Sequence, residues 1–207
     1  MEVILINILL VDDHVLFAKS LAIAFEEYSE IENFYIIQEM RSLEQTIKQK
    51  NIDIVLMDIN LGKLTNNDGL YIAENLKIIF PFLNIIILTG YDLPVYRYKA
   101  KKLGINGFLN KNISPDKLFD CLLKVHQGYT CFPMESNIQI EELTSTEKNI
   151  LFLLSTGKKR KEIAHELFIS ERTLSNHLQH IYEKLSVTSS VEAVTKAIQM
   201  GYITPIF

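Results

Sequence analysis

The stretch Ile52-Asp53-Ile54-Val55-Leu56-Met57-Asp58-Ile59-Asn60 decides the fold of this chain. It is a short, apolar run rich in β-branched residues, and a carboxylate, Asp58, ends it. Such a run is typical of a strand that is buried on both faces of a parallel sheet. Ligands of open parallel sheets bind outside the carboxyl ends of the strands. The stretch therefore predicts that Asp58 lies at the functional edge of a parallel sheet.

Further apolar runs alternate with helical patterns through the first 127 residues. We expect strands at 4–11, 34–37, 83–88 and 107–110, and helices at 14–28, 70–80, 95–103 and 115–127, with a short helix opened by Ser42 as cap and Gln45 at the capping-box position. Ser114 is expected to cap the last of these helices, ahead of Pro115. This alternation predicts a doubly wound, five-stranded parallel sheet of the flavodoxin-like α/β class. A dinucleotide site would need glycines after the first strand, and the run that begins at Asp12 has none.

Composition narrows the classes of protein further. The 207 residues carry a net charge of −4, which does not suggest a nucleic-acid binder as a whole, but basic residues cluster locally at Lys158-Lys159-Arg160-Lys161. The start has no basic leader, and no apolar run approaches the ~18 residues of a membrane span, so we expect a cytoplasmic protein that does not enter a membrane. In that compartment Cys121 and Cys131 are expected to be free thiols.

Four of the expected strand ends carry polar residues that fit one chemistry. Asp12 and Asp13 follow the first strand, Asp58 the third, Thr89 the fourth and Lys111 the fifth. Converging carboxylates repel unless a cation joins them, and Mg²⁺ prefers such oxygen ligands together with a phosphate partner. Asp58 is then placed to attack a phosphoryl group, while Thr89 and Lys111 bind its oxygens. The simpler alternative for each residue alone is an acid or polar group that ends a strand.

These residues give residues 4–127 a clear resemblance to the receiver domain of two-component response regulators. The resemblance implies that Asp58 is the phosphoacceptor, that Asp12 and Asp13 bind Mg²⁺ with Asp58, and that Asn60 lends the ion its backbone carbonyl. It also implies that Thr89 and Lys111 stabilise the phosphoryl group. Phe108 stands at the position of the aromatic residue that swings inward on phosphorylation.

The loop after Asp58 departs from the family pattern. The family has a proline four residues after the phosphoacceptor, where this chain has Gly62. The Asp-Gly pair of the family comes later here, at Asp68-Gly69, and Thr65-Asn66-Asn67 is the expected insertion. Because the loop borders the site, we expect cation affinity or phosphoryl lifetime to differ from those of relatives.

Phosphorylation suggests a switch. A phosphoryl group on Asp58 adds about −1.5 to −2 of charge. Movement of Thr89 toward it would vacate space for Phe108 and reshape the surface of helix 95–103. That surface carries a set of exposed aromatic and basic side chains suited to a regulated protein contact, although a solvated helix face is an alternative. The set is Tyr91, Tyr96, Arg97, Tyr98, Lys99, Lys101 and Lys102.

The remainder of the chain divides into a linker and a helical domain. Periodicity is lost over 128–142, which separates a domain at 1–127 from one at 143–207. Thr144 and Glu147 form a capping box, Ser170 caps a longer helix, and Ser189 caps the last. Two short helices joined by a tight turn predict a helix-turn-helix.

Residues 143–203 resemble the carboxy-terminal DNA-binding domain of the LuxR/FixJ (NarL) family. The matching residues include Leu143-Thr144, Glu147, Lys161-Glu162-Ile163-Ala164, Ile169-Ser170, Thr173, Asn176-His177-Leu178, Ile181-Tyr182, Lys184-Leu185 and Val187. Departures are Thr146 for an arginine, Ser175 for a lysine, Ser186 for a glycine and Ser190 for an arginine.

The outward face of the expected recognition helix predicts how DNA is read. Asn176 and Gln179 have amide geometry suited to adenine edges, whereas basic side chains suit phosphates, although a solvated polar face would look similar. The expected DNA-binding residues are Lys158, Lys159, Arg160, Lys161, Arg172, Thr173, Ser175, Asn176, Gln179 and Lys184. The last helix often forms the dimer contact in the family; Val191, Val194 and Ile198 are candidates, with core packing as the alternative.

Together these features predict a transcriptional response regulator. A sensor histidine kinase is expected to phosphorylate Asp58, and the phosphorylated chain is expected to bind double-stranded DNA as a homodimer. Beyond self-phosphorylation and autodephosphorylation we expect no enzymatic activity. One alternative is a regulator with an atypical receiver that works without phosphate. Another is an aspartate-based phosphotransferase or phosphatase, which usually carries a second acid where this chain has Asn60.

Overall fold

The computed structural model describes residues 5–37, 39–62, 64–65, 67–133 and 140–203. The chain separates into two compact units: the first contains a β-sheet and the second is built from helices. Among the described residues, no helix combines the length and the apolar character that crossing a bilayer requires.

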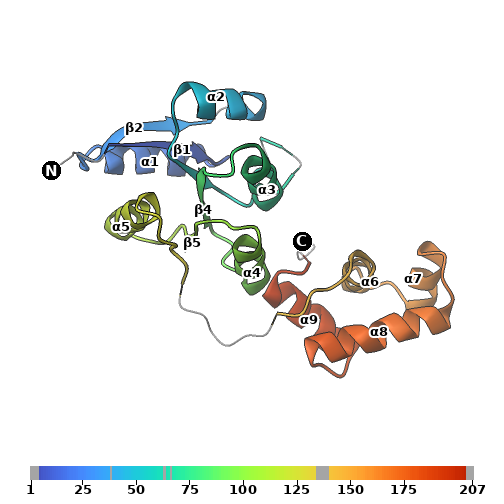
Figure 1. Cartoon of the computed structure of the whole chain (residues 1–207). Coiled ribbons are helices and arrows are strands. Elements are labelled where there is room, and N and C mark those ends of the chain that lie inside the picture. The colour runs from blue at the N-terminus through green and yellow to red at the C-terminus, as the bar shows by residue number, and fades with distance from the viewer. Residues whose placement is uncertain (1–4, 38, 63, 66, 134–139, 204–207) are drawn as a thin grey trace. The chain divides into compact units, whose positions relative to one another are not determined.

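Five strands of the first unit form one parallel sheet in the order β2-β1-β3-β4-β5 (Figure 1). They are β1 (Ile6–Val11), β2 (Ile31–Ile36), β3 (Ile54–Met57), β4 (Asn84–Thr89) and β5 (Gly107–Asn110). The strand that ends before Asp58 is central, since β3 pairs with β1 on one side and β4 on the other. This order confirms the predicted doubly wound α/β sheet.

Helices cover both faces of the sheet (Figure 1). In β3, Ile54 and Leu56 pack in the cluster that includes residues of α1 (Val15–Phe25) and α5 (Pro115–His126). Val55 and Met57 pack in the opposite cluster, with residues of α2 (Leu43–Gln49), α3 (Gly69–Ile79) and α4 (Pro94–Lys102). Both sets alternate with period two, which explains why the sequence of a doubly covered strand is apolar throughout.

Two of the expected helix caps differ from the prediction. Ser42 ends a short 3-10 helix, Met40–Ser42, and its hydroxyl donates to the Glu39 carbonyl at 2.8 Å. Its backbone is already helical, so its side chain does not cap α2. Ser114 also makes no side-chain cap bond, and Pro115 begins α5. The side chain of Asp68 does cap α3, because it accepts a hydrogen bond from the Tyr71 amide at 2.8 Å.

Cys121 and Cys131 are joined by a disulfide, so the prediction of free thiols is wrong for this structure. Their Cα atoms lie 5.8 Å apart. The fold brings them together because Cys121 packs on α5 beside the sheet, while Cys131 lies next to β5 in a bridge with Gly107. The sequence-based expectation rested on the compartment and could not foresee this proximity.

The second unit contains α6 (Ser145–Ser155), α7 (Arg160–Glu166), α8 (Glu171–Leu185) and α9 (Ser190–Met200). The predicted capping box is present, with the Thr144 hydroxyl accepting from the Glu147 amide. Ser170 and Ser189 cap α8 and α9 as expected. Apolar residues of all four helices share one core.

Ser186 ends α8 with φ 51° and ψ 54°, in the left-handed region. This is the position at which the resembling family has a glycine. A side chain in this conformation costs about 1–2 kcal/mol, which explains the family preference. The chain here tolerates a serine at that cost.

Candidate functional site

Backbone hydrogen bonds hold the strand ends of the first unit together. The Asp58 amide donates to the Val11 carbonyl at 2.9 Å, and the Lys111 amide donates to the Thr89 carbonyl at 3.0 Å. Because neighbouring parallel strands end at one edge, residues far apart in sequence are delivered to the same place. The pairing of neighbouring strands therefore confirms that these strand ends lie at one edge of the sheet.

Lys111 bridges two buried carboxylates. Its ammonium lies 2.7 Å from Asp12 Oδ2 and 2.7 Å from Asp58 Oδ2. The Asp12 and Asp58 side chains are 0% and 2% exposed, so their charges need this partner. The second oxygen of Asp58, Oδ1, accepts from the Ile59 amide at 2.7 Å. The carboxylate is thereby fixed in orientation at the carboxyl end of β3.

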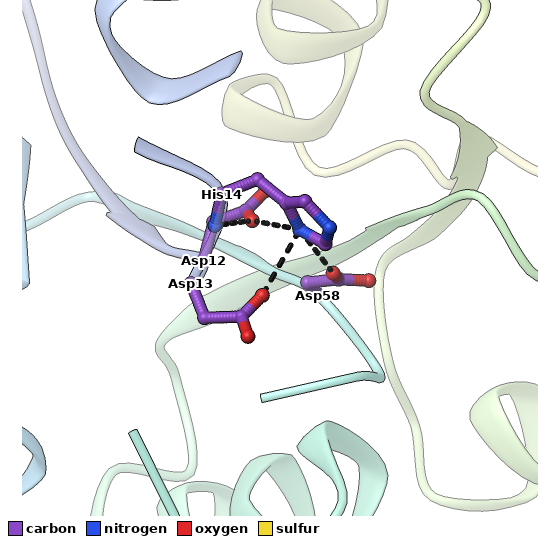
Figure 2. A group of neighbouring side chains, drawn as sticks. All are labelled: Asp12, Asp13, His14 and Asp58. Carbon is purple, nitrogen blue, oxygen red and sulfur yellow. Dashed lines mark hydrogen bonds and ion pairs between the residues drawn. The ribbon is translucent and has the colours of Figure 1, made fainter. Parts of the chain in front are cut away.

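His14 completes the cluster, and sequence reasoning missed it. Its Nδ1 lies 2.9 Å from Asp13 Oδ1, 3.2 Å from Asp12 Oδ1 and 3.9 Å from Asp58 Oδ2. Figure 2 shows the ring directed between the three carboxyl groups. The signal that could have found it is the run Asp12-Asp13-His14 directly after a strand, where the third residue still borders the sheet edge.

The donor atoms of this cluster fit a divalent cation. One ligand atom from each of Asp12, Asp13, His14 and Asp58 lies within 4.8 Å of the others. Carboxylate oxygens are the ligands that Mg²⁺ prefers, whereas the imidazole nitrogen is better suited to transition metals. Asn60 is exposed just beyond β3. Receiver domains typically hold Mg²⁺ in an acidic pocket of this kind.

Thr89 and Phe108 are both fully buried. The Thr89 hydroxyl oxygen accepts a hydrogen bond from the Tyr91 amide at 3.2 Å. Phe108 packs in the cluster formed with α2, α3 and α4. The Phe108 side chain is thus part of the core of the first unit.

The loop after Asp58 is fastened at both ends, although Lys63 and Asn66 lie outside the described residues. Near its start, the Leu64 and Thr65 amides donate to the buried Leu61 carbonyl at 2.7 and 2.9 Å. At its end, a Cβ on Gly69 would stand 1.8 Å from the Asp58 carbonyl oxygen. Only glycine permits this approach, so Gly69 packs directly against the strand end at Asp58.

Most of the expected DNA-binding side chains are on the surface of the second unit. Arg172, Thr173, Ser175, Asn176 and Gln179 are exposed along α8. The exposed basic residues Lys159, Arg160 and Lys161 stand at the start of α7, and half-buried Lys158 is paired with Glu166. The Gln179 amide donates to Glu183 Oε1 at 2.9 Å.

Lys184 differs from the other members of this set. Its ammonium lies 2.9 and 2.8 Å from the two carboxylate oxygens of Glu147, a residue that is only 3% exposed. Burial raises the pKa of Glu147, but hydrogen bonds from Lys184 and Thr144 outweigh it, so the pKa lies below its ordinary 4.5. The structure therefore gives Lys184 an internal partner, which the sequence pattern alone did not suggest.

Comparison with known families agrees with both units. Residues 8–123 match the family model described as "Response regulator receiver domain". Residues 141–197 match the model described as "Bacterial regulatory proteins, luxR family". Together the two matches span the first and second units.

Individual relatives match most of the chain. The transcriptional regulatory protein DesR of Bacillus subtilis is 34% identical over 160 residues, covering 75% of this chain and 78% of DesR. The Fimbriae Z protein of Escherichia coli is 27% identical over 203 residues, covering 92% and 95%.

Solved structures share the fold. The Salmonella typhimurium response regulator RcsB has a TM-score of 0.61 at 23% identity, covering 93% of this chain and 97% of that one. An RcsB–DNA complex has a TM-score of 0.67 at 21% identity, covering 94% and 98%. The response regulator ChrA has a TM-score of 0.53 at 27% identity, covering 97% and 100%. The chain belongs to the LuxR-type response regulators, in which a receiver domain is joined to a helix-turn-helix DNA-binding domain.

Proposed function

We propose that a sensor histidine kinase phosphorylates Asp58 and that this modification promotes DNA binding by a homodimer in the cytoplasm. The observation that carries the proposal is the fixed Asp58 carboxylate, held by Lys111 and by the Ile59 amide beside the Asp12–Asp13–His14 cluster. A buried carboxylate with an ammonium and further ligands around it is arranged for phosphoryl transfer by positioning and charge neutralisation.

The transfer needs Asp58 in its charged form. An oxygen of the carboxylate attacks phosphorus, the bond from phosphorus to the donor histidine nitrogen breaks, and that nitrogen keeps the electron pair and takes up a proton. The product is an acyl phosphate on Asp58 and a neutral histidine on the donor. Self-phosphorylation from small donors and autodephosphorylation follow the same in-line geometry.

The surrounding residues have separate parts in this step. Lys111 neutralises charge on the phosphoryl oxygens, and the Thr89 hydroxyl, which accepts from the Tyr91 amide, donates its own hydrogen to one of them. Asp12, Asp13, Asp58 and the Asn60 carbonyl would hold Mg²⁺, which when bound screens the carboxylates from the incoming phosphoryl group. Movement of Thr89 toward the phosphoryl group would alter the packing of β4 against Phe108.

A surface next to the site supports docking of the kinase there. A surface depression opens between α1 and the start of α5, lined by Phe17, Leu21, Ala24, Lys111, Ile113 and Leu118. On the same helix, Val15 is 65% and Leu16 is 81% exposed. An apolar surface next to the Lys111 ammonium would bring a partner's phosphohistidine close to Asp58.

The second domain would read DNA through α8. Asn176 and Gln179 would face base edges in the major groove, with Thr173 and Ser175 beside them, while Lys158, Lys159, Arg160, Lys161 and Arg172 would contact phosphates. Val191 is 77% exposed at the start of α9 and would lead the dimer contact, whereas Val194 and Ile198 are partly packed in the core. Dimerisation would place two copies of α8 on paired half-sites.

The test is direct phosphorylation. The full chain is incubated with Mg²⁺ and a small phosphodonor, and the mass of the intact protein is measured. Wild type should gain one phosphoryl group and Asp58→Ala none. Asp53→Asn is the matched control, because Asp53 lies at the opposite end of β3 and binds the Asn7 amide at 2.8 Å. Wild type that gains no phosphoryl mass would contradict the proposal.

A second candidate is a regulator that works without phosphate. The complete burial of Phe108 favours it, because this side chain is already packed in the core of the unmodified chain. In that case DNA affinity would be the same before and after labelling of Asp58.

A further inference from the structure

The segment that follows α5 is attached to the sheet by few contacts. Cys131 forms a single parallel bridge with Gly107 of β5, which is an edge strand. The Cys131 amide donates to the Asn106 carbonyl at 2.9 Å, and the Phe108 amide donates to the Cys131 carbonyl at 2.9 Å. Phe132 adds a partly buried ring beneath Lys101, whose ammonium lies 5.2 Å from the ring centroid. Within the described part of the segment, residues 127–133, the sheet is thus extended by one bridge.

The disulfide is the covalent attachment of this segment. Cys121 lies on α5, and the chain from Cys121 to Cys131, ten positions further along the sequence, forms a closed loop when the bond is present. A cross-link of this size restricts the freedom of the opened segment and so favours the paired state. The bond therefore acts on the same two amide contacts that join Cys131 to the residues around Phe108.

The cysteine pair is reachable from solvent. Cys131 is half-buried and Cys121 is 9% exposed. Both line an open surface depression, together with Asn110, Lys117, Lys124 and Phe132. Two aspartates, Asp92 and Asp120, line the same depression and balance the charges of the two lysines. The thiolate is the form of a cysteine that takes part in exchange.

We propose that Cys121 and Cys131 are a reversible thiol–disulfide site that controls how firmly the segment after α5 is held on β5. In proteins of a reducing compartment, a cysteine pair at bonding distance is typical of redox sensing rather than of permanent cross-linking. The site would exchange with dithiol proteins or glutathione. Its location links the redox state to the segment that leads toward the DNA-binding domain.

Reduction of the disulfide to two thiols takes up two electrons and two protons. In reduction, a thiolate of the partner attacks one cysteine sulfur, the S–S bond breaks, and the released cysteine thiolate takes a proton. The partner's second thiol then resolves the mixed disulfide, so two electrons pass to the protein, which ends with two thiols, and the partner ends as a disulfide. Oxidation by glutathione disulfide is the reverse, with two glutathione thiols as products.

The first measurement is the redox equilibrium of the full chain. The protein is equilibrated in buffers of graded ratio of reduced to oxidised glutathione, quenched with a maleimide, and weighed intact. We expect one two-electron step, in which the number of maleimide-labelled thiols falls from two to none as the buffer becomes more oxidising. A pair that stays labelled at every ratio, or that forms only mixed or intermolecular disulfides, would overturn the proposal.

The second measurement is hydrogen exchange at the amides of Phe108 and Cys131. Oxidised wild type should exchange at these positions on the order of 10-fold more slowly than reduced wild type. Cys131→Ser and Cys121→Ala should show the reduced rate under both conditions, with no response to glutathione. Equal exchange in oxidised and reduced wild type would show that the bond does not control the segment. The readouts do not depend on Asp58, so they stay informative if phosphorylation fails.

Discussion

Asp58 is 2% exposed and bound by Lys111, whereas Asn176 and Gln179 stand exposed on α8 with no apolar packing to fix them. The receiver site is built from buried charges that neutralise one another at the edge of a sheet. The surface proposed to read DNA is built mostly from exposed groups, whose contacts are limited to near neighbours such as that of Gln179 with Glu183. Changes at the receiver site should therefore affect stability and chemistry together, while changes on α8 should affect binding alone. Lys184 is the exception, because it belongs to the DNA-binding unit yet is engaged like Lys111.

The largest effect is expected from Lys111→Met. The buried carboxylates of Asp12 and Asp58 then lose the ammonium group that pairs with them. This loss should lower the free energy of unfolding by about 3 kcal/mol in metal-free buffer. Mg²⁺ should restore part of the loss, because a cation then neutralises the same oxygens. Denaturant unfolding of the full chain measures both values. Lys117→Met, at an exposed position of α5, is the control and should change neither. Equal stability of Lys111→Met and wild type would contradict the role given to the buried charges.

Lys184→Met should destabilise the second unit by about 2 kcal/mol, because Glu147 loses its ammonium partner. The pKa of Glu147 is lowered in the folded chain, so its contribution is present above the ordinary value of 4.5 and disappears as the pH falls through the folded value. The difference in stability between wild type and variant should thus shrink in acid. Thermal unfolding from neutral pH to below pH 4.5 follows this trend. A stability difference between wild type and variant that grows in acid would contradict the lowered pKa of Glu147.

Asn176→Ala should relax base preference without changing the fold. Loss of a bidentate contact to a base edge costs about 1–3 kcal/mol of discrimination against the wrong base. Selection of bound sites from a random DNA pool, for wild type and variant, measures this preference. His180→Ala, exposed on the same helix, should retain it. An unchanged preference in Asn176→Ala would assign base reading to other side chains.

Lys159→Ala should weaken binding to all sequences by a similar factor. Loss of one phosphate contact reduces the slope of log affinity against log salt by about 1. Titrations at several salt concentrations measure the slope. Lys184→Met serves as a comparison. Because Lys184 pairs with Glu147, its replacement should leave the slope of log affinity against log salt unchanged. A reduced slope in Lys184→Met would place that lysine on DNA as well.

The smallest expected effect is a gain in stability from Ser186→Gly. A left-handed serine costs about 1–2 kcal/mol, part of which the greater freedom of glycine in the unfolded chain offsets. A net gain of about 0.5 kcal/mol should raise the unfolding midpoint of the second unit slightly. Gly157→Ala, at φ 81°, is the converse variant and should lower it. Loss of stability in Ser186→Gly would mean that the serine side chain makes a compensating contact.

The sequence predicted the sheet and its site because topology leaves little choice. An apolar run that ends on Asp58 must be buried, and parallel pairing then brings Val11, Thr89 and Lys111 to the same edge. It did not predict His14: the run Asp12-Asp13-His14 places the residue beside the sheet edge, but the direction of its ring depends on the three carboxyl groups around it. The Glu147 partner of Lys184 and the disulfide of Cys131 were not foreseen for a related reason: both depend on a partner that the sequence pattern does not point to, Glu147 in one case and Cys121 in the other. The predicted cap at Ser42 was wrong because this residue belongs to a 3-10 helix ahead of α2 and its hydroxyl donates to the Glu39 carbonyl.

The central claim is that the chemical state of Asp58 controls DNA binding. The most direct measurement is the affinity of the full chain for a selected DNA site, with and without a small phosphodonor and Mg²⁺, for wild type and Asp58→Ala in parallel. Phosphorylated wild type should bind between about 5-fold and 150-fold more tightly than the unmodified protein, the range of an ordinary coupling energy. Asp58→Ala should not respond. Equal affinity of wild type before and after a phosphoryl group is confirmed by mass would contradict the claim.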